Sequence, residues 1–396
     1  MPRSSVSRPA AAGILGCAAF LLIGWTGLLV PSLIRSIKET FDQSDAGIGL
    51  VYLLYASAYA AGSLGGGLAT ERLGRRTVLA LAAAVHGIGL LLLGLGPTWI
   101  IFMTAALPMG LGAGGIDGGV NGLFLDLFRS GRGRALNLLH LFFSLGALTA
   151  PLAVGFLVEG GVAWQPILIG TALMVIPVAV LFGVVEMPGG RHDRRGRPSE
   201  RGVAAGGART RFAAPIILLG VAISCYVASE VGVSSWLVRF LEPAPLAQAT
   251  TALSLFWAGL AVGRLVSSQV ADRFDHLAFA TVSAVGIAVA LIGAIFVPSL
   301  PISIALFAIT GFASGPVFPM IVAIGGERYP DRSAAVSGFL TGSAVVGSVI
   351  YPPVMGFLSV TVGLTVAMVG NVILALASAG ALLLVGRSRR GDNVPA

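Results

Sequence analysis

Twelve apolar segments, most of them close to the length of a membrane-spanning helix, divide this sequence. A helix needs about 20 consecutive, mainly apolar residues to cross the hydrocarbon core of a bilayer. The breaks between the segments hold charged residues, Gly and Pro, which favour turns. We therefore predict an all-α membrane protein with twelve transmembrane helices. The predicted spans are 10–34, 46–70, 77–96, 98–125, 135–158, 163–187, 212–240, 248–271, 277–297, 302–325, 333–358 and 362–386.

The composition excludes most other classes of protein. Charged residues make up 11% of the chain and hydrophobic residues 56%, whereas about a quarter of a soluble domain is charged. Cys17 and Cys225 both lie in apolar segments, so we expect no disulfide framework. The four histidines are scattered and no phosphate-binding Gly-Lys-Ser or Gly-Lys-Thr loop is present. We expect no catalytic residues, no enzyme activity, no metal and no organic cofactor.

Lys and Arg residues are concentrated in alternate connections between the predicted spans. Twenty-one of the 25 fall on one side, and Arg35, Lys38 and Arg239 fall on the other. By the positive-inside rule we predict a protein of the cytoplasmic (inner) membrane, with both termini in the cytoplasm. The basic residues are expected to contact anionic lipid. They are not interleaved with aromatic residues on a soluble face, so we expect no nucleic-acid partner.

The chain divides into two similar halves. We predict a six-helix bundle in residues 1–187, a cytoplasmic linker at 188–211 that is rich in Pro, Gly and Arg, and a second six-helix bundle in 212–396. Two parallel repeats of this kind are a transporter architecture, with the site near the middle of the membrane. A constant offset of 201 residues pairs Gly62 with Gly263, Arg72 with Arg273, Gly110 with Gly311, Gly114 with Gly315, Gly146 with Gly347, Pro151 with Pro352, Gly155 with Gly356 and Phe156 with Phe357.

An acid and an amide lie inside the fourth predicted span. Gly110, Gly114, Asp117 and Asn121 follow one another at helical spacing and form one stripe. A carboxylate in the middle of a membrane costs roughly 2.5 to 3.5 kcal/mol even on lenient scales. The glycines allow a neighbouring helix or a solute to come close. We predict that Asp117 and Asn121 bind substrate or a proton; the alternative is an acid that serves only helix packing.

The connection between the second and third spans resembles a family signature. It reads Gly67-Leu-Ala-Thr-Glu71-Arg72-Leu-Gly74-Arg75-Arg76, which is similar to the G-x-L-A-D-R-x-G-R-R motif of the major facilitator superfamily, with Glu in place of the usual Asp. In the second half the matching residues are Asp272 and Arg273. The resemblance implies the major facilitator fold and a gate at the cytoplasmic ends, where carboxylates and guanidinium groups form charge-assisted bonds. The alternative is that these arginines only set the topology.

A second resemblance concerns the transport site. Asp117 and Asn121, the segment around His140 in the fifth span and the segment from Glu230 to Trp236 in the seventh are similar to the fucose:proton symporter family and its sugar-transporting relatives. That resemblance implies a role for Asp117 in proton-coupled sugar uptake. Fucose carriers of the family also hold an acid in the first span, and this chain has none between residues 13 and 32.

Other polar and aromatic residues are candidates for the substrate pathway. We expect His140 to pass protons, and the alternative is a neutral packing histidine. Glu230, the acid of the second half, is a candidate for binding substrate or a proton, and the alternative is a gate hydrogen bond. Trp236 and Trp257 are expected either to stack on a solute or to pack. Further candidates that line the pathway are Asn137, Ser144, Tyr226 and Ser234.

Two features of the second half concern its backbone and its buried charge. Arg264, inside the eighth span, needs a partner, and Asp272 lies eight residues further on. The segment from Ser314 to Pro319 is expected to interrupt the tenth span. Such a break is tolerated only beside protein or a water-filled cavity, so we predict a site at that depth.

We predict a proton-coupled secondary transporter that works by alternating access as a monomer and imports a small polar solute, with sugars as the expected class. Sodium coupling stays open. A second hypothesis is efflux of drugs or amphipathic metabolites, because Gly146, Pro151 and Gly155 partly match the Gly-Pro signature of drug:proton antiporters. A third, a membrane sensor or lipid-handling protein, is disfavoured because the longest loop has about 24 residues and a sensor usually carries a soluble output domain.

Overall fold

The computed structural model describes residues 8–128, 132–187, 214–270 and 273–391. Twelve helical spans in these ranges are long and apolar enough to cross a membrane, which confirms the all-α, twelve-span prediction. The helices are α1 Arg8–Gly27, α2 Leu29–Phe41, α3 Asp45–Leu73, α4 Arg75–Leu95, α5 Trp99–Leu127, α6 Arg132–Glu159, α7 Trp164–Val184, α8 Ala214–Phe240, α9 Leu246–Val270, α10 His276–Phe296, α11 Leu300–Ser314, α12 Val317–Arg328, α13 Ser333–Thr361 and α14 Leu364–Gly391, with a short 3₁₀ helix η3 at Pro330–Arg332.

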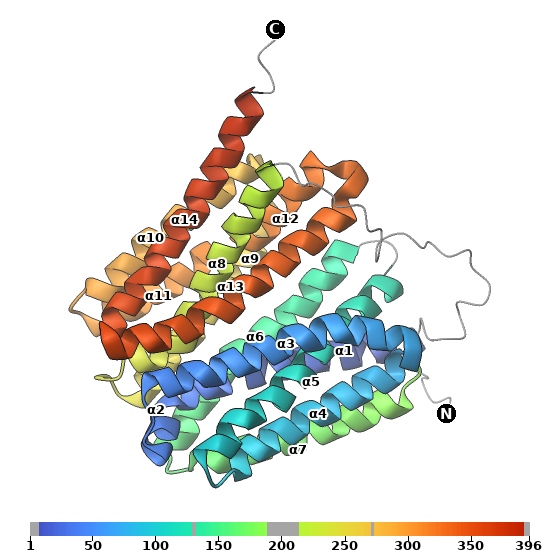
Figure 1. Ribbon diagram of the computed structural model, residues 1–396, viewed down its shortest axis with the longest axis vertical. Helices are drawn as coiled ribbons and strands as arrows, with labels where there is room; N and C mark the ends of the chain where they lie inside the picture. The colour runs from blue at the N-terminus through green and yellow to red at the C-terminus, as the bar shows by residue number, and fades with distance from the viewer. Residues whose placement is uncertain (1–7, 129–131, 188–213, 271–272, 392–396) are drawn as a thin grey trace, which may run out of the picture. The chain divides into compact units, whose positions relative to one another are not determined.

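The chain forms two compact units, Met1–Pro198 and Ser199–Ala396. The first contains α1 to α7 and the second α8 to α14, as the colours from blue to red show in Figure 1. The linker predicted at 188–211 lies outside the described residues. In the first unit α5 packs along α3 and α4, and in the second unit α11 packs along α9 and α10.

The first span is longer than predicted and is broken in its middle. It runs from Pro9 to Phe41, and α1 ends at Gly27 while α2 begins at Leu29. Pro31 explains the break, because proline has no N–H for the carbonyl four residues earlier and its ring crowds the preceding turn. The tenth span breaks as the sequence predicts, with α11 ending at Ser314 and α12 beginning at Val317.

Glycines bring the same two helices of each unit into backbone contact. A Cβ atom on Gly110 of α5 would lie 2.2 Å from the Tyr55 carbonyl oxygen of α3. A Cβ on Gly311 of α11 would lie 1.9 Å from the Phe256 carbonyl oxygen of α9. Only residues without a side chain permit such close approach. The sequence repeat is therefore a repeat of helix contacts.

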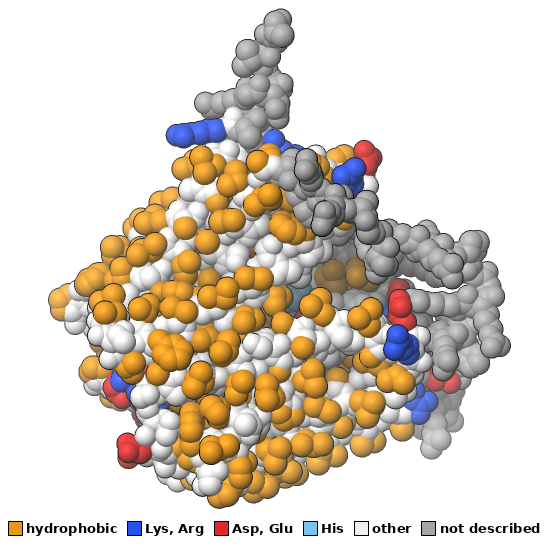
Figure 2. All heavy atoms as spheres, in the orientation of Figure 1, with side chains coloured by type: hydrophobic (Ala, Val, Ile, Leu, Met, Phe, Trp, Pro, Cys, Tyr) orange, Lys and Arg blue, Asp and Glu red, His pale blue; other side chains and the backbone are white. Residues whose placement is uncertain are grey.

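The outer surfaces of the helices are apolar. Leu64 and Phe156 expose 75% and 79% of their surface, and hydrophobic side chains are spread across the face seen in Figure 2. Such exposure suits contact with lipid rather than water.

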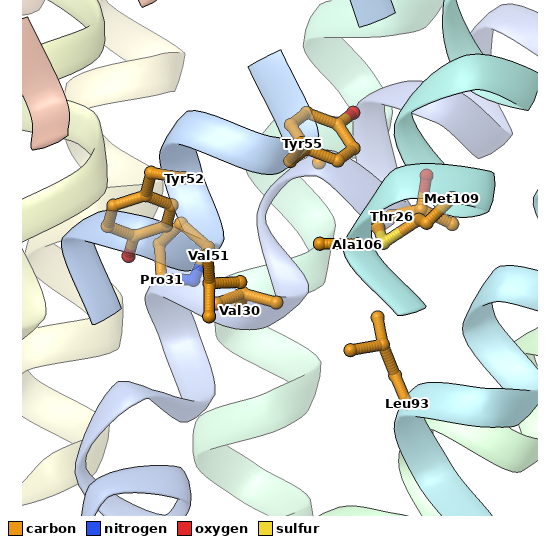
Figure 3. A pocket seen from close by; sticks show the side chains of 10 residues that line it. Thr26, Val30, Pro31, Val51, Tyr52, Tyr55, Leu93, Ala106 and Met109 are labelled. Atoms are coloured by element: carbon orange, nitrogen blue, oxygen red, sulfur yellow. The ribbon is translucent and has the colours of Figure 1, made fainter. Parts of the chain in front are cut away.

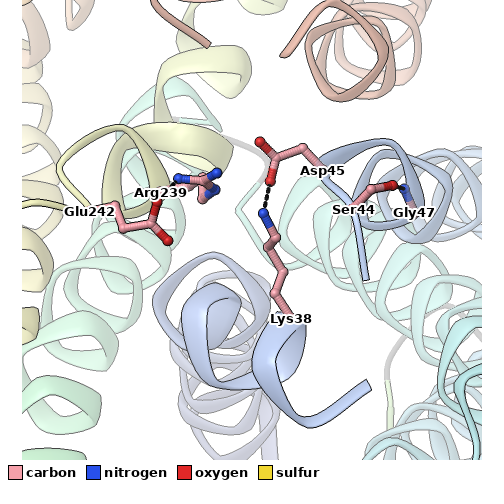
Figure 4. A network of polar contacts seen from close by, with 6 residues as sticks. All are labelled: Lys38, Ser44, Asp45, Gly47, Arg239 and Glu242. Carbon is pink, nitrogen blue, oxygen red and sulfur yellow. Dashed lines mark hydrogen bonds and ion pairs between the residues drawn. The ribbon is translucent and has the colours of Figure 1, made fainter. Parts of the chain in front are cut away.

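Ion pairs lie where helices begin and end. In the first unit Lys38, in the last turn of α2, bonds to the buried Asp45 at the start of α3 (Figure 4). In the second unit Arg239, in the last turn of α8, bonds to Glu242 (Figure 4).

Candidate functional site

The first unit builds a polar cluster around Asp117. The Asn121 amide donates to the Asp117 carboxylate at 3.0 Å and also to the Asp117 backbone carbonyl at 3.0 Å. Tyr59 of α3 donates a side-chain hydrogen bond to the same carboxylate, and Tyr55, one turn earlier, interacts with it electrostatically. The structure therefore brings together two of the predicted site residues and adds two tyrosines that the sequence analysis missed.

The glycine stripe positions this cluster. Gly114, one turn before Asp117, lies against the backbone of Tyr59, and Gly118 would place a Cβ 2.6 Å from the Ser63 carbonyl oxygen. Close approach of α3 to α5 lets the phenol of Tyr59 reach the carboxylate across the helix interface. The hydrogen-bond partners of Asp117 in the described part of the first unit are neutral. Gain or loss of a proton at Asp117 consequently changes the net charge of the cluster.

The candidates on α6 occupy different environments. His140 is exposed and packs edge-on against Phe20 of α1, with ring centroids 5.4 Å apart. Asn137, one turn earlier, is also exposed. Ser144 is buried, and its hydroxyl donates to the His140 backbone carbonyl at 3.1 Å. The roles assigned to these three residues stay predictions.

His86 of α4, which the sequence analysis left without a role, is fully buried in the first unit. Its Nδ1 lies 2.8 Å from the Met109 carbonyl oxygen and its Nε2 lies 3.0 Å from the Thr26 hydroxyl. Both ring nitrogens therefore have partners. Thr26 and Met109 also line a cavity of about 30 Å³ beside the break of the first span, together with Tyr52 and Tyr55 (Figure 3). This volume suits a single water molecule.

The second unit builds its own polar cluster around Glu230 of α8. The hydroxyl of Tyr226, one turn earlier and 1% exposed, hydrogen-bonds to Glu230. The same hydroxyl bonds to the Ser314 carbonyl oxygen, at 2.9 Å, where α11 ends. Arg264 of α9 interacts electrostatically with both Tyr226 and Glu230. The Arg264 guanidinium thus has partners in this cluster, and the partner suggested from sequence, Asp272, lies outside the described residues.

The aromatic candidates lie within the second unit. The Trp257 indole donates to the Ser234 hydroxyl at 3.0 Å, which joins α9 to α8. Trp236 is completely buried, and its indole donates to the Pro352 carbonyl oxygen of α13 at 2.9 Å. These bonds favour packing for Trp236, and its suggested contact with a solute stays a prediction.

The segment from Gly67 to Arg76, which resembles a family signature, lies where α3 ends and α4 begins. Gly74 has φ +84°, a backbone conformation that glycine adopts without strain, and it lets the chain turn sharply between the two helices. Arg75 is buried and bonds to Asp126 of α5 at 2.7 Å. The motif residues Gly67, Glu71, Arg72, Gly74 and Arg76 expose part or most of their surface, as does Arg273 in the second unit.

The second unit holds an equivalent of that ion pair. His276 bonds to Glu327 at 2.6 Å, and both residues lie 201 positions after Arg75 and Asp126. The sequence analysis missed Asp126, His276 and Glu327, although the constant offset between the halves was the signal that could have found them. The first unit uses a permanently charged guanidinium here, and the second uses an imidazole.

A family model described as Major Facilitator Superfamily matches residues 14–244 and, in a second match, residues 215–396. "Bypass of stop codon protein 6" of Saccharomyces cerevisiae is 25% identical over 382 residues, which cover 87% of this chain and 76% of that protein. "Sodium-dependent glucose transporter 1A" of Mus musculus is 22% identical over 380 residues, covering 86% and 88%. "Protein TsgA" of Shigella flexneri is 24% identical over 257 residues, and this match spans 63% of each chain.

Solved structures share the fold at low sequence identity. A bacterial homologue of the human lysosomal transporter Spinster, inward-facing and unoccupied, superimposes with a TM-score of 0.77 at 17% identity and covers 99% of this chain and 100% of that one. The D-xylose–proton symporter gives 0.76 at 15%, covering 95% and 96%. The E. coli fucose:proton symporter gives 0.64 at 17%, covering 94% and 98%.

Proposed function

Because the chain belongs to the major facilitator superfamily, we propose that it is a secondary active transporter that couples movement of a small polar solute to movement of protons. The solute class that we favour is sugars. The transporter works by alternating access in the cytoplasmic membrane, with both termini in the cytoplasm. Relatives of this fold include proteins named as proton symporters of xylose and fucose and a sodium-dependent glucose transporter. Those names concern those proteins, and they support the proposal by analogy of fold alone.

One observation carries the proposal, namely the Asp117 cluster inside a membrane-spanning helix. An ionised carboxylate in hydrocarbon is costly unless a cation or a proton neutralises it. In the described part of the first unit, Asp117 has the neutral hydrogen-bond partners Tyr59 and Asn121. These partners orient the carboxylate without neutralising it, which leaves its charge to be set by an exchangeable proton. A group of this kind suits the coupling site of a transporter.

Neutral, hydroxyl-rich solutes fit the chemistry of the two clusters. Carboxylate, amide and phenol groups accept and donate hydrogen bonds to hydroxyl groups. In the first unit the cluster around Asp117 holds a single carboxylate, and in the second Glu230 is accompanied by Arg264. The cluster around Asp117 is negatively charged when its carboxylate is ionised, which disfavours an anionic solute there.

The first experiment identifies the solute and its driving force. A thermal-shift screen of the purified protein against sugars, nucleosides and common drugs finds ligands, because a ligand at about 100 times its dissociation constant adds about 2.7 kcal/mol of stability. Proteoliposomes are then given an inward proton gradient or an inward sodium gradient of equal size. The proposal expects uptake above equilibrium with the proton gradient and its loss when an ionophore collapses the gradient. Uptake driven by sodium alone, or drug export without sugar uptake, would refute it.

A further inference from the structure

The phenol of Tyr226 contacts two hydrogen-bond acceptors but has one hydrogen to donate. Its oxygen contacts the Glu230 carboxyl and lies 2.9 Å from the Ser314 carbonyl oxygen. A tyrosine hydroxyl donates one hydrogen bond and accepts others, whereas a carbonyl oxygen and an ionised carboxylate only accept. One hydrogen cannot form a linear bond to both neighbours at once. The two contacts are satisfied together only when Glu230 carries a proton and donates it to the phenol oxygen.

With Glu230 protonated, every hydrogen in this chain of contacts has an acceptor. The Glu230 hydroxyl donates to the Tyr226 oxygen, and the Tyr226 hydroxyl donates to the Ser314 carbonyl. When Glu230 releases its proton to water, the phenolic hydrogen turns to the carboxylate. The Tyr226 oxygen then faces the Ser314 carbonyl without a hydrogen between them, and the two oxygens repel each other. Deprotonation therefore removes a bond between α8 and the end of α11.

That bond lies at the break of the tenth span. Ser314 is the last residue of α11, and α12 begins after Gly315 and Pro316. Proline cannot supply a backbone N–H, so side-chain bonds matter more at this junction than inside a regular helix. Discontinuous helices are also where transporters of this kind place their substrate and coupling-ion sites. A hydrogen bond that forms when Glu230 gains a proton and breaks when Glu230 loses it would stabilise the α11–α12 junction in the protonated state only.

The surroundings of Glu230 allow the proton to leave. Arg264 of α9 hydrogen-bonds to Tyr226 and interacts electrostatically with Glu230, so a positive charge stays beside the carboxylate when the proton leaves. Tyr351 of α13 donates instead to the Ala367 carbonyl at 2.8 Å. On α8 itself and on the described parts of the helices that pack against it (α9, α12, α13 and α14), the other titratable or charged side chains are Cys225, Arg239, Glu327, Arg328 and Arg387.

We propose that Tyr226 is a positioning residue that links protonation of Glu230 to the α11–α12 break. When Glu230 is protonated, the Tyr226–Ser314 hydrogen bond joins α8 to the end of α11. When Glu230 is ionised, this bond is lost. This inference rests on the proposed proton-coupled transport for its purpose, but its physical content is a statement about the second unit alone. It assigns a second protonation site in addition to Asp117.

Two measurements on the full-length protein in lipid test the link. Infrared difference spectra across a pH titration report the carboxylic-acid band of Glu230, identified by its absence in Glu230→Gln. Hydrogen–deuterium exchange of the peptide 311–324, normalised at each pH to the rate of an unstructured peptide, reports how firm the break is. In the native protein we expect exchange to rise about fivefold as the Glu230 band disappears, which corresponds to the loss of one buried hydrogen bond.

Three variants separate the roles. In Glu230→Gln the amide N–H can donate to the phenol, so exchange should stay slow at every pH. In Tyr226→Phe exchange should be fast at every pH while Glu230 still titrates. Tyr351→Phe is the matched control, because it removes another phenol that donates to a backbone carbonyl in the same unit, and the native pH dependence should persist.

The inference is overturned if either Glu230→Gln or Tyr226→Phe keeps the native pH dependence of exchange. Should Tyr226→Phe fail to fold, the inference is still tested by Glu230→Gln, which should lose the pH dependence of exchange, and by Tyr351→Phe, which should keep it. None of these measurements needs a solute. Asp117→Asn should leave the pH dependence of the 311–324 peptide intact, so failure of the transport proposal and failure of this inference are distinguishable.

Discussion

Replacing Gly114 with alanine tests whether backbone contact between α3 and α5 builds the Asp117 cluster. The new Cβ would lie 2.0 Å from the Tyr59 carbonyl oxygen and 2.8 Å from the Ser63 backbone nitrogen. Both obstacles are backbone atoms of a helix, so no side-chain rotation relieves them. The helices must separate by about 1 Å or more before the contact reaches an ordinary van der Waals distance. The Tyr59 phenol would withdraw from Asp117 with its helix.

Two effects oppose each other in this variant. Alanine gains up to about 1 kcal/mol over glycine in helix propensity, whereas overpacking in a close-packed interface costs about 1–3 kcal/mol or more. We expect the overpacking to win, with a net loss of roughly 2 kcal/mol. For a unit of this size that loss lowers the apparent Tm by roughly 4–8 °C, measured on purified protein at one fixed scan rate because membrane proteins often unfold irreversibly.

Gly65→Ala on α3 is the matched control. A Cβ at this position meets nothing within 4 Å, so the same substitution should leave the Tm unchanged or raise it slightly. The reasoning is refuted if Gly114→Ala is as stable as Gly65→Ala. It is also refuted if Gly114→Ala loses stability but retains full proton-driven uptake, because the glycine stripe would then have no part in placing Asp117.

Three further predictions concern the helix ends and the aromatic core. Asp126→Asn removes the ionic partner of the buried Arg75, and should lower stability by about 1 kcal/mol, seen as a lower Tm; an unchanged Tm would mean that the pair contributes nothing. His276→Arg places a guanidinium opposite Glu327, as Arg75 lies opposite Asp126, and should keep or raise the Tm; a lower Tm would contradict the equivalence of the two pairs. Trp236→Phe leaves a buried carbonyl without its indole donor and should cost about 1–3 kcal/mol without changing solute affinity, whereas weaker binding at unchanged stability would place Trp236 in the solute pathway.

Hydropathy and spacing were sufficient to predict the fold. Each span needs a long apolar segment, and this requirement is visible in the sequence without any knowledge of tertiary contacts. The break of the tenth span followed from its prolines. The break of the first span was missed, although Pro31 lies inside the predicted span. A single proline after a long apolar segment does not show whether a helix kinks or ends. The extension of this span to Phe41 was missed because residues 35–41 are largely polar.

The polar clusters were predictable only in part. Asp117 and Asn121 share one helix face, so helical spacing was enough to pair them, and the same holds for Tyr226 and Glu230. Tyr59, Arg264 and Ser314 reach their clusters from other helices, and a single sequence carries no direct signal for such contacts. The ion pair of His276 with Glu327 was accessible through the internal repeat. It was overlooked because the second half has a histidine at the position where the first half has an arginine, so the two positions are not identical in the repeat.

The most direct test of the central claim measures how strongly Asp117→Asn couples solute accumulation to a proton gradient. Glu39→Gln serves as its control, because Glu39 is an exposed acid of α2 that lies outside the Asp117 cluster. Proteoliposomes loaded with the identified solute report exchange, and empty ones under an inward proton gradient report accumulation at the final plateau, which is independent of rate. The account predicts that Asp117→Asn exchanges solute but accumulates none above equilibrium, while Glu39→Gln reaches the native plateau. Native accumulation by Asp117→Asn would contradict it.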